Sequence, residues 1–189
     1  MERQRILKGE VELPGLDMLP VSETYSARHL LLGMLQTEPA SRPKMSEVIG
    51  HCFFWEEKAL MENLRAIHRL EPEKLRCQLQ LVAAPSASEV DSLEAEALKQ
   101  LAGWRNPFKG QALLARMDSY AAASPYEASF AGLIRFLRNL VEHPPTTTEA
   151  AGLRSLEGGI ERGLPFFLRR VYPTLPVAVL AVMRRQASN

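Results

Sequence analysis

Three polar side chains in the second half of the chain have types and spacing that could act on a substrate. Arg138 and Asn139 are adjacent, and His143 follows Asn139 by four residues. On an α-helix, residues four apart lie one turn apart on the same face. Arginine can hold an anion through charge-assisted hydrogen bonds, and histidine can transfer a proton near neutral pH. A helix here would therefore present Arg138, Asn139 and His143 together to a substrate.

The surrounding residues predict the helix that must position these three. Arg135 lies on the same polar side as Arg138. The opposite side carries an apolar stripe of the kind that faces a core, made by Leu133, Leu137, Leu140 and Val141. We expect a helix over 130–142 that docks by this stripe. Because Pro144 follows His143 directly, it biases His143 out of α-helical backbone geometry.

The rest of the chain predicts helices and almost no strands. Apolar residues recur at helical spacing in several segments, whereas almost nothing alternates with a period of two. Helices are expected over 27–35, 46–49, 56–69, 89–102, 112–120, 149–157, 160–171 and 176–185. Residues 83–88 predict a linker or loop, and the loop 103–110 holds Trp104, which we expect to fill a core position. The fold class is therefore predicted to be all-α.

Composition excludes several classes of protein. The net charge of the 189 residues is +1, so nucleic-acid binding would need a local basic patch. Cys52 and Cys77 lie far apart, which argues against a zinc site and fits a reducing compartment. The first ten residues are charged and contain no signal-peptide core, and no apolar run reaches the length of a membrane span. We expect this chain alone to be soluble and cytoplasmic.

Residues 1–58 resemble the end of a eukaryotic protein kinase. The resemblance rests on ARHLLLGML at 27–35, EPASRP at 38–43 and HCFFW at 51–55. In that family the loop arginine pairs with a glutamate of the activation segment, and the aromatic residues close the base of the C-lobe. We therefore expect a truncated kinase C-lobe end, in which Arg42, without that partner, and Trp55 are structural. No glycine-rich loop, HRD or DFG motif is present, so ATP and Mg²⁺ chemistry belongs to the kinase portion of a full-length parent.

Residues 59–189 resemble the kinase-extension nuclease domain of the inositol-requiring-enzyme family and of ribonuclease L. Three segments match in the same order as in the family: the loop 104–106, the helix 130–143 and the closing segment 166–173. Ahead of them, residues 2–7 resemble the family's segment before the last kinase helices. The resemblance spans nearly the whole chain. It implies an all-helical, metal-independent endoribonuclease that needs no cofactor.

The resemblance also implies roles for individual residues. The family places catalysis on a tyrosine, an Arg-Asn pair and a histidine, which match Tyr126, Arg138, Asn139 and His143. These groups serve an attack of the RNA 2′-hydroxyl on the adjacent phosphate, which leaves a 2′,3′-cyclic phosphate. Arg135 is expected to contact RNA. One alternative stays open, because Tyr120 competes with Tyr126 for the tyrosine role. The chain also departs from the family pattern, since Leu140, Val141 and Glu142 stand where the family has basic residues.

The resemblance further implies partners and a cellular setting. The family acts in the unfolded-protein response and in mRNA processing, and it is activated when its kinase part drives homodimerisation. Its full-length stress sensors sit on the cytosolic face of the endoplasmic reticulum. The alternative function is an inactive interaction and dimerisation module that keeps only the fold.

Other polar residues are expected to have no catalytic role. His29, His51 and His68 share no metal-ligand spacing and are expected to be surface or packing residues. The pairs at 169–170 and 184–185 are expected to be solvated arginines.

Overall fold

The computed structural model describes residues 13, 15–86, 88–109, 112–144, 146 and 160–187. Every regular element within these residues is helical, which confirms the all-α prediction. The α-helices in chain order are α2 (Val21–Met34), α3 (Met45–Ile49), α4 (Glu57–His68), α5 (Pro72–Ala83), α6 (Glu89–Gln100), α7 (Ala112–Tyr120), α8 (Phe130–Glu142), α10 (Ile160–Val171) and α11 (Leu175–Ala187). Short 3-10 turns lie at Leu16–Met18, Pro39–Ser41, Cys52–Phe54, Leu101–Gly103 and Asn106–Phe108. The predicted helix over 149–157 and the segment 2–7 lie outside the described residues.

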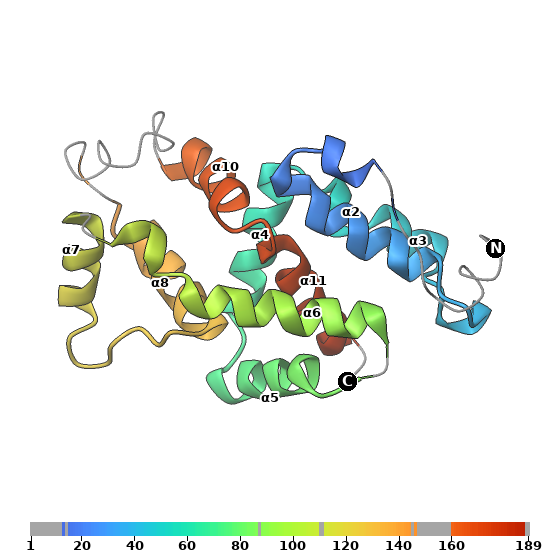
Figure 1. The fold of residues 1–189 in the computed structure, drawn as a ribbon. Helices are drawn as coiled ribbons and strands as arrows, with labels where there is room; N and C mark the ends of the chain where they lie inside the picture. Colours follow the sequence, from blue (N-terminus) through green and yellow to red (C-terminus); the bar gives the residue numbers. More distant parts are fainter. Residues whose placement is uncertain are drawn as a thin grey trace.

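Helix α11 runs through the middle of the molecule (Figure 1). It packs against α2, α4, α5 and α6. Its sequence is apolar on all sides until the arginines of the last turn, and such a helix is buried rather than laid on a surface. Residues from Leu175 to Val179 are all buried, so α11 joins α2 to the helices α4, α5 and α6.

Helix α8 and the loop before α7 form the other part of the core. The apolar side of α8 buries Leu133, Leu137 and Leu140. Trp104 is completely buried and packs near Phe136, with 4.8 Å between the ring centroids. This aromatic packing fixes which side of α8 faces inward.

Most predicted helix bounds agree with the structure to within a few residues, but α5 was not predicted. Its Leu75, Gln78 and Val82 are buried while most of its other side chains are exposed. Pro72 occupies the first turn, a position that favours a helix start and was the available sequence signal. The buried polar Gln78 weakens the apolar periodicity on which the other predictions depended.

Two packing predictions were wrong. Val141 was placed on the buried stripe of α8, yet 38% of it is exposed because the last turn extends past the core. The aromatic residues at 53–55 were expected to close the base of the lobe. The turn there instead buries His51 and Cys52 and leaves Phe54 55% exposed. Trp55 does pack, partly buried, against the core, and its indole N–H donates to the Gly50 carbonyl.

Arg42 is exposed and stabilises the loop between α2 and α3. Its Nε donates to the carbonyl of Gln36 at 2.8 Å. The contact closes the turn between α2 and α3, so the structural role here is local.

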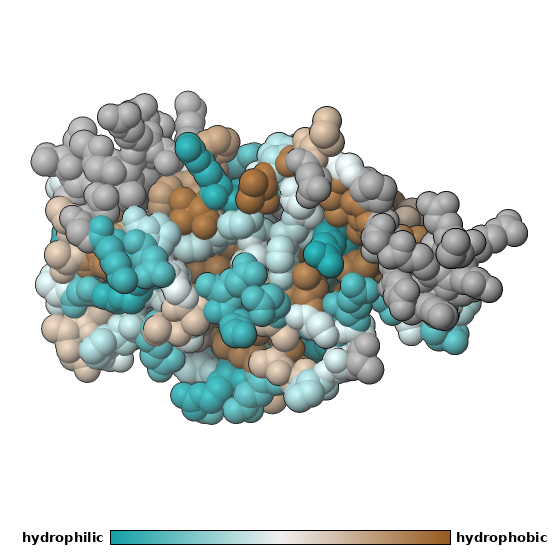
Figure 2. All heavy atoms as spheres, in the orientation of Figure 1, coloured by the Kyte–Doolittle hydropathy of each residue, from teal (hydrophilic) through white to brown (hydrophobic). Residues whose placement is uncertain are grey.

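No single helix in the described part of the chain is long and apolar enough to cross a membrane; α10 and α11 reach that composition only as a pair bent by 97°. In the view of Figure 2, hydrophilic atoms cover the outer sides of α5 and α6, and hydrophobic atoms show between them. The surface pattern matches the amphipathic sequences of these helices.

Candidate functional site

The loop that precedes α8 is fixed against the first turn of that helix. Ser129 caps α8, its hydroxyl accepting from the N–H of Gly132 at 3.1 Å. The Trp104 indole N–H donates to the Glu127 carbonyl at 2.9 Å, which ties the loop to the core. A Cβ at Gly132 would lie 2.0 Å from the same Glu127 oxygen, so only glycine allows this approach. The loop thereby sets the position of Tyr126.

Tyr126 lies under α8 and contacts two of the predicted site residues. Its ring is 5% exposed, and its hydroxyl accepts from the Asn139 amide at 2.7 Å. The Arg135 guanidinium lies 5.2 Å from the ring centroid, a cation–π distance, and donates to the Ser124 hydroxyl at 3.0 Å. Tyr126 therefore holds Asn139 and Arg135 in place.

His143 ends α8 and faces a different tyrosine. Its backbone has φ −125° and ψ 73°, outside helical geometry, as the following proline predicted. Its N–H still donates to the Asn139 carbonyl at 2.8 Å. The imidazole stacks on the ring of Tyr120 from α7, with 5.0 Å between centroids and 21° between planes. Tyr120 is 55% exposed, so this pair faces solvent.

Arg116 supports the stacked pair from α7. Its guanidinium donates to the His143 carbonyl at 3.0 Å and lies 5.6 Å from the Tyr120 ring centroid. The sequence interpretation did not select Arg116. Its four-residue spacing from Tyr120 was the signal that could have identified it.

Arg138 forms an ion pair on the surface of α8. Its Nε donates to the Glu142 carboxylate at 2.9 Å, one helical turn away. The hydrogen bond from Arg138 lowers the pKa of Glu142, so this carboxylate is ionised near neutral pH. Both side chains are about half exposed, so solvent screens the pair and an incoming phosphate can compete for Arg138.

The structure thus separates the predicted residues into two contacts on the last turns of α8. Tyr126 joins Asn139 and Arg135, while His143 joins Tyr120. The two contacts are linked by the backbone hydrogen bond between His143 and Asn139. Arg138 takes part in neither contact and pairs with Glu142.

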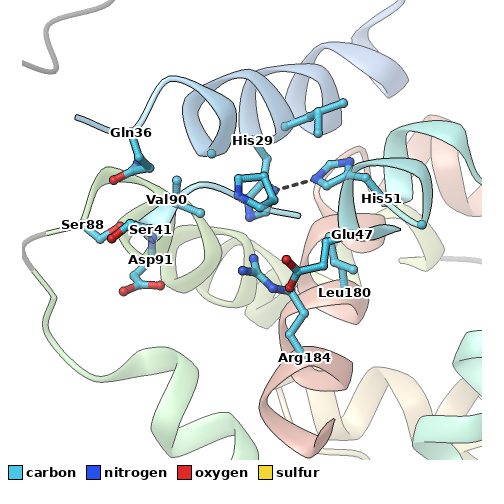
Figure 3. A pocket seen from close by; sticks show the side chains of 14 residues that line it. His29, Gln36, Ser41, Glu47, His51, Ser88, Val90, Asp91, Leu180 and Arg184 are labelled. Atoms are coloured by element: carbon cyan, nitrogen blue, oxygen red, sulfur yellow. Dashed lines mark hydrogen bonds between the residues drawn. The ribbon is translucent and has the colours of Figure 1, made fainter. Parts of the chain in front are cut away.

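A second polar cluster lies far from α8 and is buried. His29 Nδ1 lies 2.8 Å from His51 Nε2 (Figure 3). His29 Nε2 lies 3.1 Å from Glu94 Oε1. The N–H of Phe53 donates to His51 Nδ1 at 3.1 Å. His51 must therefore carry its proton on Nε2 and donate to His29, which donates in turn to Glu94. Both imidazoles are neutral in this arrangement, and burial lowers the pKa of His51 to about 3.

The arginine pairs are less solvated than expected. Arg184 and Arg185 each form an ion pair with an acidic residue of α6, at 3.2 Å to Glu94 and 3.0 Å to Asp91. Arg169 is partly buried and donates to the Trp55 carbonyl, whereas Arg170 and Arg184 are exposed, as predicted. These contacts bind α11 and α10 to segments far away in sequence, which periodicity within one helix cannot indicate.

The polar clusters described above do not include a set of metal ligands. Across residues 15–86, 88–109, 112–144 and 160–187, no group of three or more His, Cys, Asp or Glu side chains could hold a metal ion.

Comparisons with known proteins show similarity to one kind of protein. The serine/threonine-protein kinase/endoribonuclease IRE1b of Arabidopsis thaliana is 27% identical over 176 residues, which are 92% of this chain and 18% of the relative. The serine/threonine-protein kinase/endoribonuclease IRE1 of Hypocrea jecorina is 41% identical over 58 residues, which are 31% of this chain and 5% of the relative. No protein-family model and no solved structure matches the chain.

The similarity extends over most of this chain but over a small part of each relative. It supports a relationship to the IRE1 kinase/endoribonucleases. An endoribonuclease role is therefore plausible on grounds independent of the site geometry.

Proposed function

We propose that residues 59–189 form a kinase-extension nuclease domain that cleaves RNA without a metal ion or cofactor. The observation that carries this proposal is the arrangement at the end of α8. Asn139 is held by one tyrosine, His143 stacks on a second tyrosine, and Arg138, the residue before Asn139, is about half exposed. The relative that matches most of this chain is named as a kinase/endoribonuclease, which agrees with it.

The reaction is an internal transesterification. The ribose 2′-oxygen loses its proton to a base and bonds to the adjacent phosphorus. The bond from phosphorus to the 5′-oxygen then breaks, and that oxygen takes a proton from an acid. The products are a 2′,3′-cyclic phosphate and a free 5′-hydroxyl, so no oxidant or further reactant is needed.

The described side chains suit the separate parts of this reaction. Arg138 exchanges Glu142 for a phosphate oxygen and stabilises the charge of the pentacoordinate phosphorus. Asn139 orients the scissile group by hydrogen bonding. His143, at the solvent-facing end of the site, transfers a proton to or from the reacting oxygens.

The two tyrosines are assigned different roles. The Tyr126 hydroxyl is buried and occupied by Asn139, which favours Tyr126 as a positioning residue. The Tyr120 ring is exposed and stacks on His143, which favours Tyr120 as the phenol that touches RNA. Arg135 contacts the Tyr126 ring and would also contact RNA.

The partners and setting are proposed from the relatives. The substrate is RNA, and activity requires a homodimer that the kinase part of a full-length parent brings together. That parent would act in unfolded-protein-response signalling and mRNA processing at the cytosolic face of the endoplasmic reticulum, where its kinase part would bind ATP and Mg²⁺.

The test is cleavage of a stem-loop RNA in EDTA by the purified chain fused to a dimerising domain. We expect cleavage products that carry 2′,3′-cyclic phosphate ends by mass spectrometry. The variants His143→Ala and Asn139→Ala should lose cleavage while keeping the helical circular dichroism of the wild type. Absence of cleavage by the dimerised wild type at micromolar concentration would contradict the proposal.

One observation favours the alternative, an inactive interaction and dimerisation module. Arg138 is paired with Glu142 in the place where the reaction needs a phosphate clamp. An inactive module predicts that the chain dimerises and yet binds no uncleavable RNA. Analytical ultracentrifugation together with an RNA-binding measurement distinguishes the two functions.

A further inference from the structure

A groove runs between the α4–α5 hairpin and α8, next to the candidate site. It consists of two adjoining hollows of about 650 Å³ and about 190 Å³. Both hollows are lined by His68, Arg69, Ile134 and Arg138, so they form one continuous groove. We call it the α5–α8 groove. Because Arg138 lines both hollows, a strand bound at Arg138 meets the groove directly.

The α5–α8 groove concentrates positive charge. Five arginines line it, namely Arg65, Arg69, Arg76, Arg135 and Arg138, against the two carboxylates of Glu127 and Glu142. The whole chain has a net charge of only +1, so this is the local basic patch that nucleic-acid binding requires. Burial and the nearby charge of Arg138 lower the pKa of His68, which leaves the charge of the groove to the arginines.

The larger hollow also has an apolar lining. Leu70, Pro72, Leu75 and Leu79 come from the α4–α5 connection and α5, and Ile134 comes from α8. Its volume of about 650 Å³ lies within the range of about 300–1,000 Å³ typical of sites for small organic ligands. Cations with apolar surface between them suit an unpaired nucleotide strand, whose phosphates meet the cations and whose bases contact the apolar surface.

We propose that the α5–α8 groove binds the single-stranded RNA that flanks the scissile phosphate. Arg69 and Arg76 hold phosphates beyond the one that Arg138 clamps. Arg76 pairs with Glu73 at 2.7 Å in the free protein, but both side chains are largely exposed, so the pair is weak and exchangeable. The assignment of the scissile phosphate to Arg138 rests on the proposed function, whereas strand binding in the groove can be measured without cleavage.

The binding test uses the double variant Arg69→Gln/Arg76→Gln and a fluorescent stem-loop RNA made uncleavable by 2′-deoxy substitution. Fluorescence anisotropy over a salt series gives the slope of log K against log salt concentration. Losing two single-strand phosphate contacts should reduce this slope by about 1.4 and weaken binding about tenfold at low salt. The charge-conserving variant Arg69→Lys/Arg76→Lys should keep most of the wild-type slope.

The matched control is the double variant Arg28→Gln/Arg170→Gln. It removes the same charge from exposed arginines of α2 and α10 that do not line the groove. We expect the control to keep the wild-type salt slope. The inference is overturned if the control loses as much binding as the groove variant, or if the groove variant binds like the wild type. It is also overturned if polyglutamate of matched charge displaces the RNA equally well, since the groove would then suit an acidic protein.

A cleavage test separates this inference from the proposed function. In the groove variant, the ratio of kcat/KM for the stem-loop to kcat/KM for a dinucleotide should fall about tenfold, because a dinucleotide cannot extend along the groove. Cleavage with an unchanged ratio would overturn the groove assignment and leave the nuclease proposal intact. If the wild type cleaves neither RNA, the nuclease proposal fails, and the anisotropy series still decides the groove.

Discussion

At the scale of single residues, Tyr126 and Tyr120 differ in what their hydroxyl groups reach. Tyr126 is buried and its hydroxyl accepts a hydrogen bond from Asn139, whereas Tyr120 lies open to solvent against His143. Loss of a partner for the partly buried amide of Asn139 lowers stability, but removal of an exposed hydroxyl does not. The two tyrosines can therefore be distinguished by stability as well as by activity.

We expect Tyr126→Phe to lower the free energy of unfolding by about 1 kcal/mol, because Asn139 loses its acceptor. Tyr120→Phe should change it by less than about 0.5 kcal/mol. Urea unfolding followed by circular dichroism measures both. If Tyr120 is the phenol that touches RNA, Tyr120→Phe should instead lower kcat. Equal stability losses in the two variants would contradict the hydrogen bond between Tyr126 and Asn139.

The ion pair between Arg138 and Glu142 leads to a second prediction at this scale. Glu142→Gln removes a carboxylate that competes with phosphate for Arg138. An exposed pair one helical turn apart contributes about 0.3–0.5 kcal/mol, so RNA binding should strengthen about twofold. Anisotropy with the uncleavable RNA measures this change.

The control for this prediction is Glu62→Gln, which breaks the exposed pair with Lys58 on α4, outside the candidate site. It should leave RNA binding nearly unchanged. Weaker binding by Glu142→Gln would show that Glu142 orients Arg138 rather than competing for it.

At the scale of elements, the close approach of the loop to the first turn of α8 depends on one glycine. Gly132→Ala would place a methyl group 2.0 Å from a backbone oxygen of Glu127, which cannot move without releasing the Trp104 hydrogen bond. We expect a loss of about 2–3 kcal/mol in the free energy of unfolding. RNA cleavage should fall as well, because the same loop carries Tyr126.

Gly33→Ala is the comparison for this variant. A methyl group at Gly33 in α2 would meet only side-chain atoms of Pro43 at 3.8 Å, an ordinary contact. Alanine is the better helix former by about 1 kcal/mol, so Gly33→Ala should stabilise the chain. A similar loss in both variants would mean that the contact with Glu127 is not the cause.

At the scale of the whole molecule, the buried histidines join the first 55 residues of the chain to α6 and α11. His51 lies just before Cys52–Phe54, His29 on α2 and Glu94 on α6, and Arg184 of α11 completes the set. Burial, and to a smaller extent the neighbouring His29 and Arg184, lowers the pKa of His51 to about 3. The fold therefore requires a neutral imidazole at this junction.

Stability should consequently fall in mild acid. The unfolded chain takes up a proton at His51 near the ordinary histidine pKa of about 6.5, whereas the folded chain does so only near pH 3. The unfolded state binds more protons between these values, so this contribution is complete above about pH 6.5 and is lost as pH falls towards 3. Between pH 7 and pH 5.5 the free energy of unfolding should drop by about 1 kcal/mol.

Urea unfolding at several pH values tests this dependence, with His51→Asn as the control. Asparagine offers an oxygen to the N–H of Phe53 and does not titrate. The variant should be less stable than the wild type at pH 7 but should change less between pH 7 and pH 5.5. An identical pH dependence would assign the acid sensitivity to other groups.

The sequence by itself determined the helical class and the bounds of α8. These features follow from a period of 3.6 residues along one segment, which local sequence records directly. The departure of His143 from helical geometry was also local, because the proline that causes it is the next residue.

Only the tertiary structure decided which groups meet across elements. It placed Tyr120 rather than Tyr126 beside His143, joined His29 to His51 across 22 residues, and paired Arg184 with Glu94 across 90. It also formed the α5–α8 groove with a helix that the sequence pattern did not predict. Such contacts depend on how loops and buried faces bring distant segments together. Helical periodicity shows which side of one helix is buried, but not which other segment packs against it.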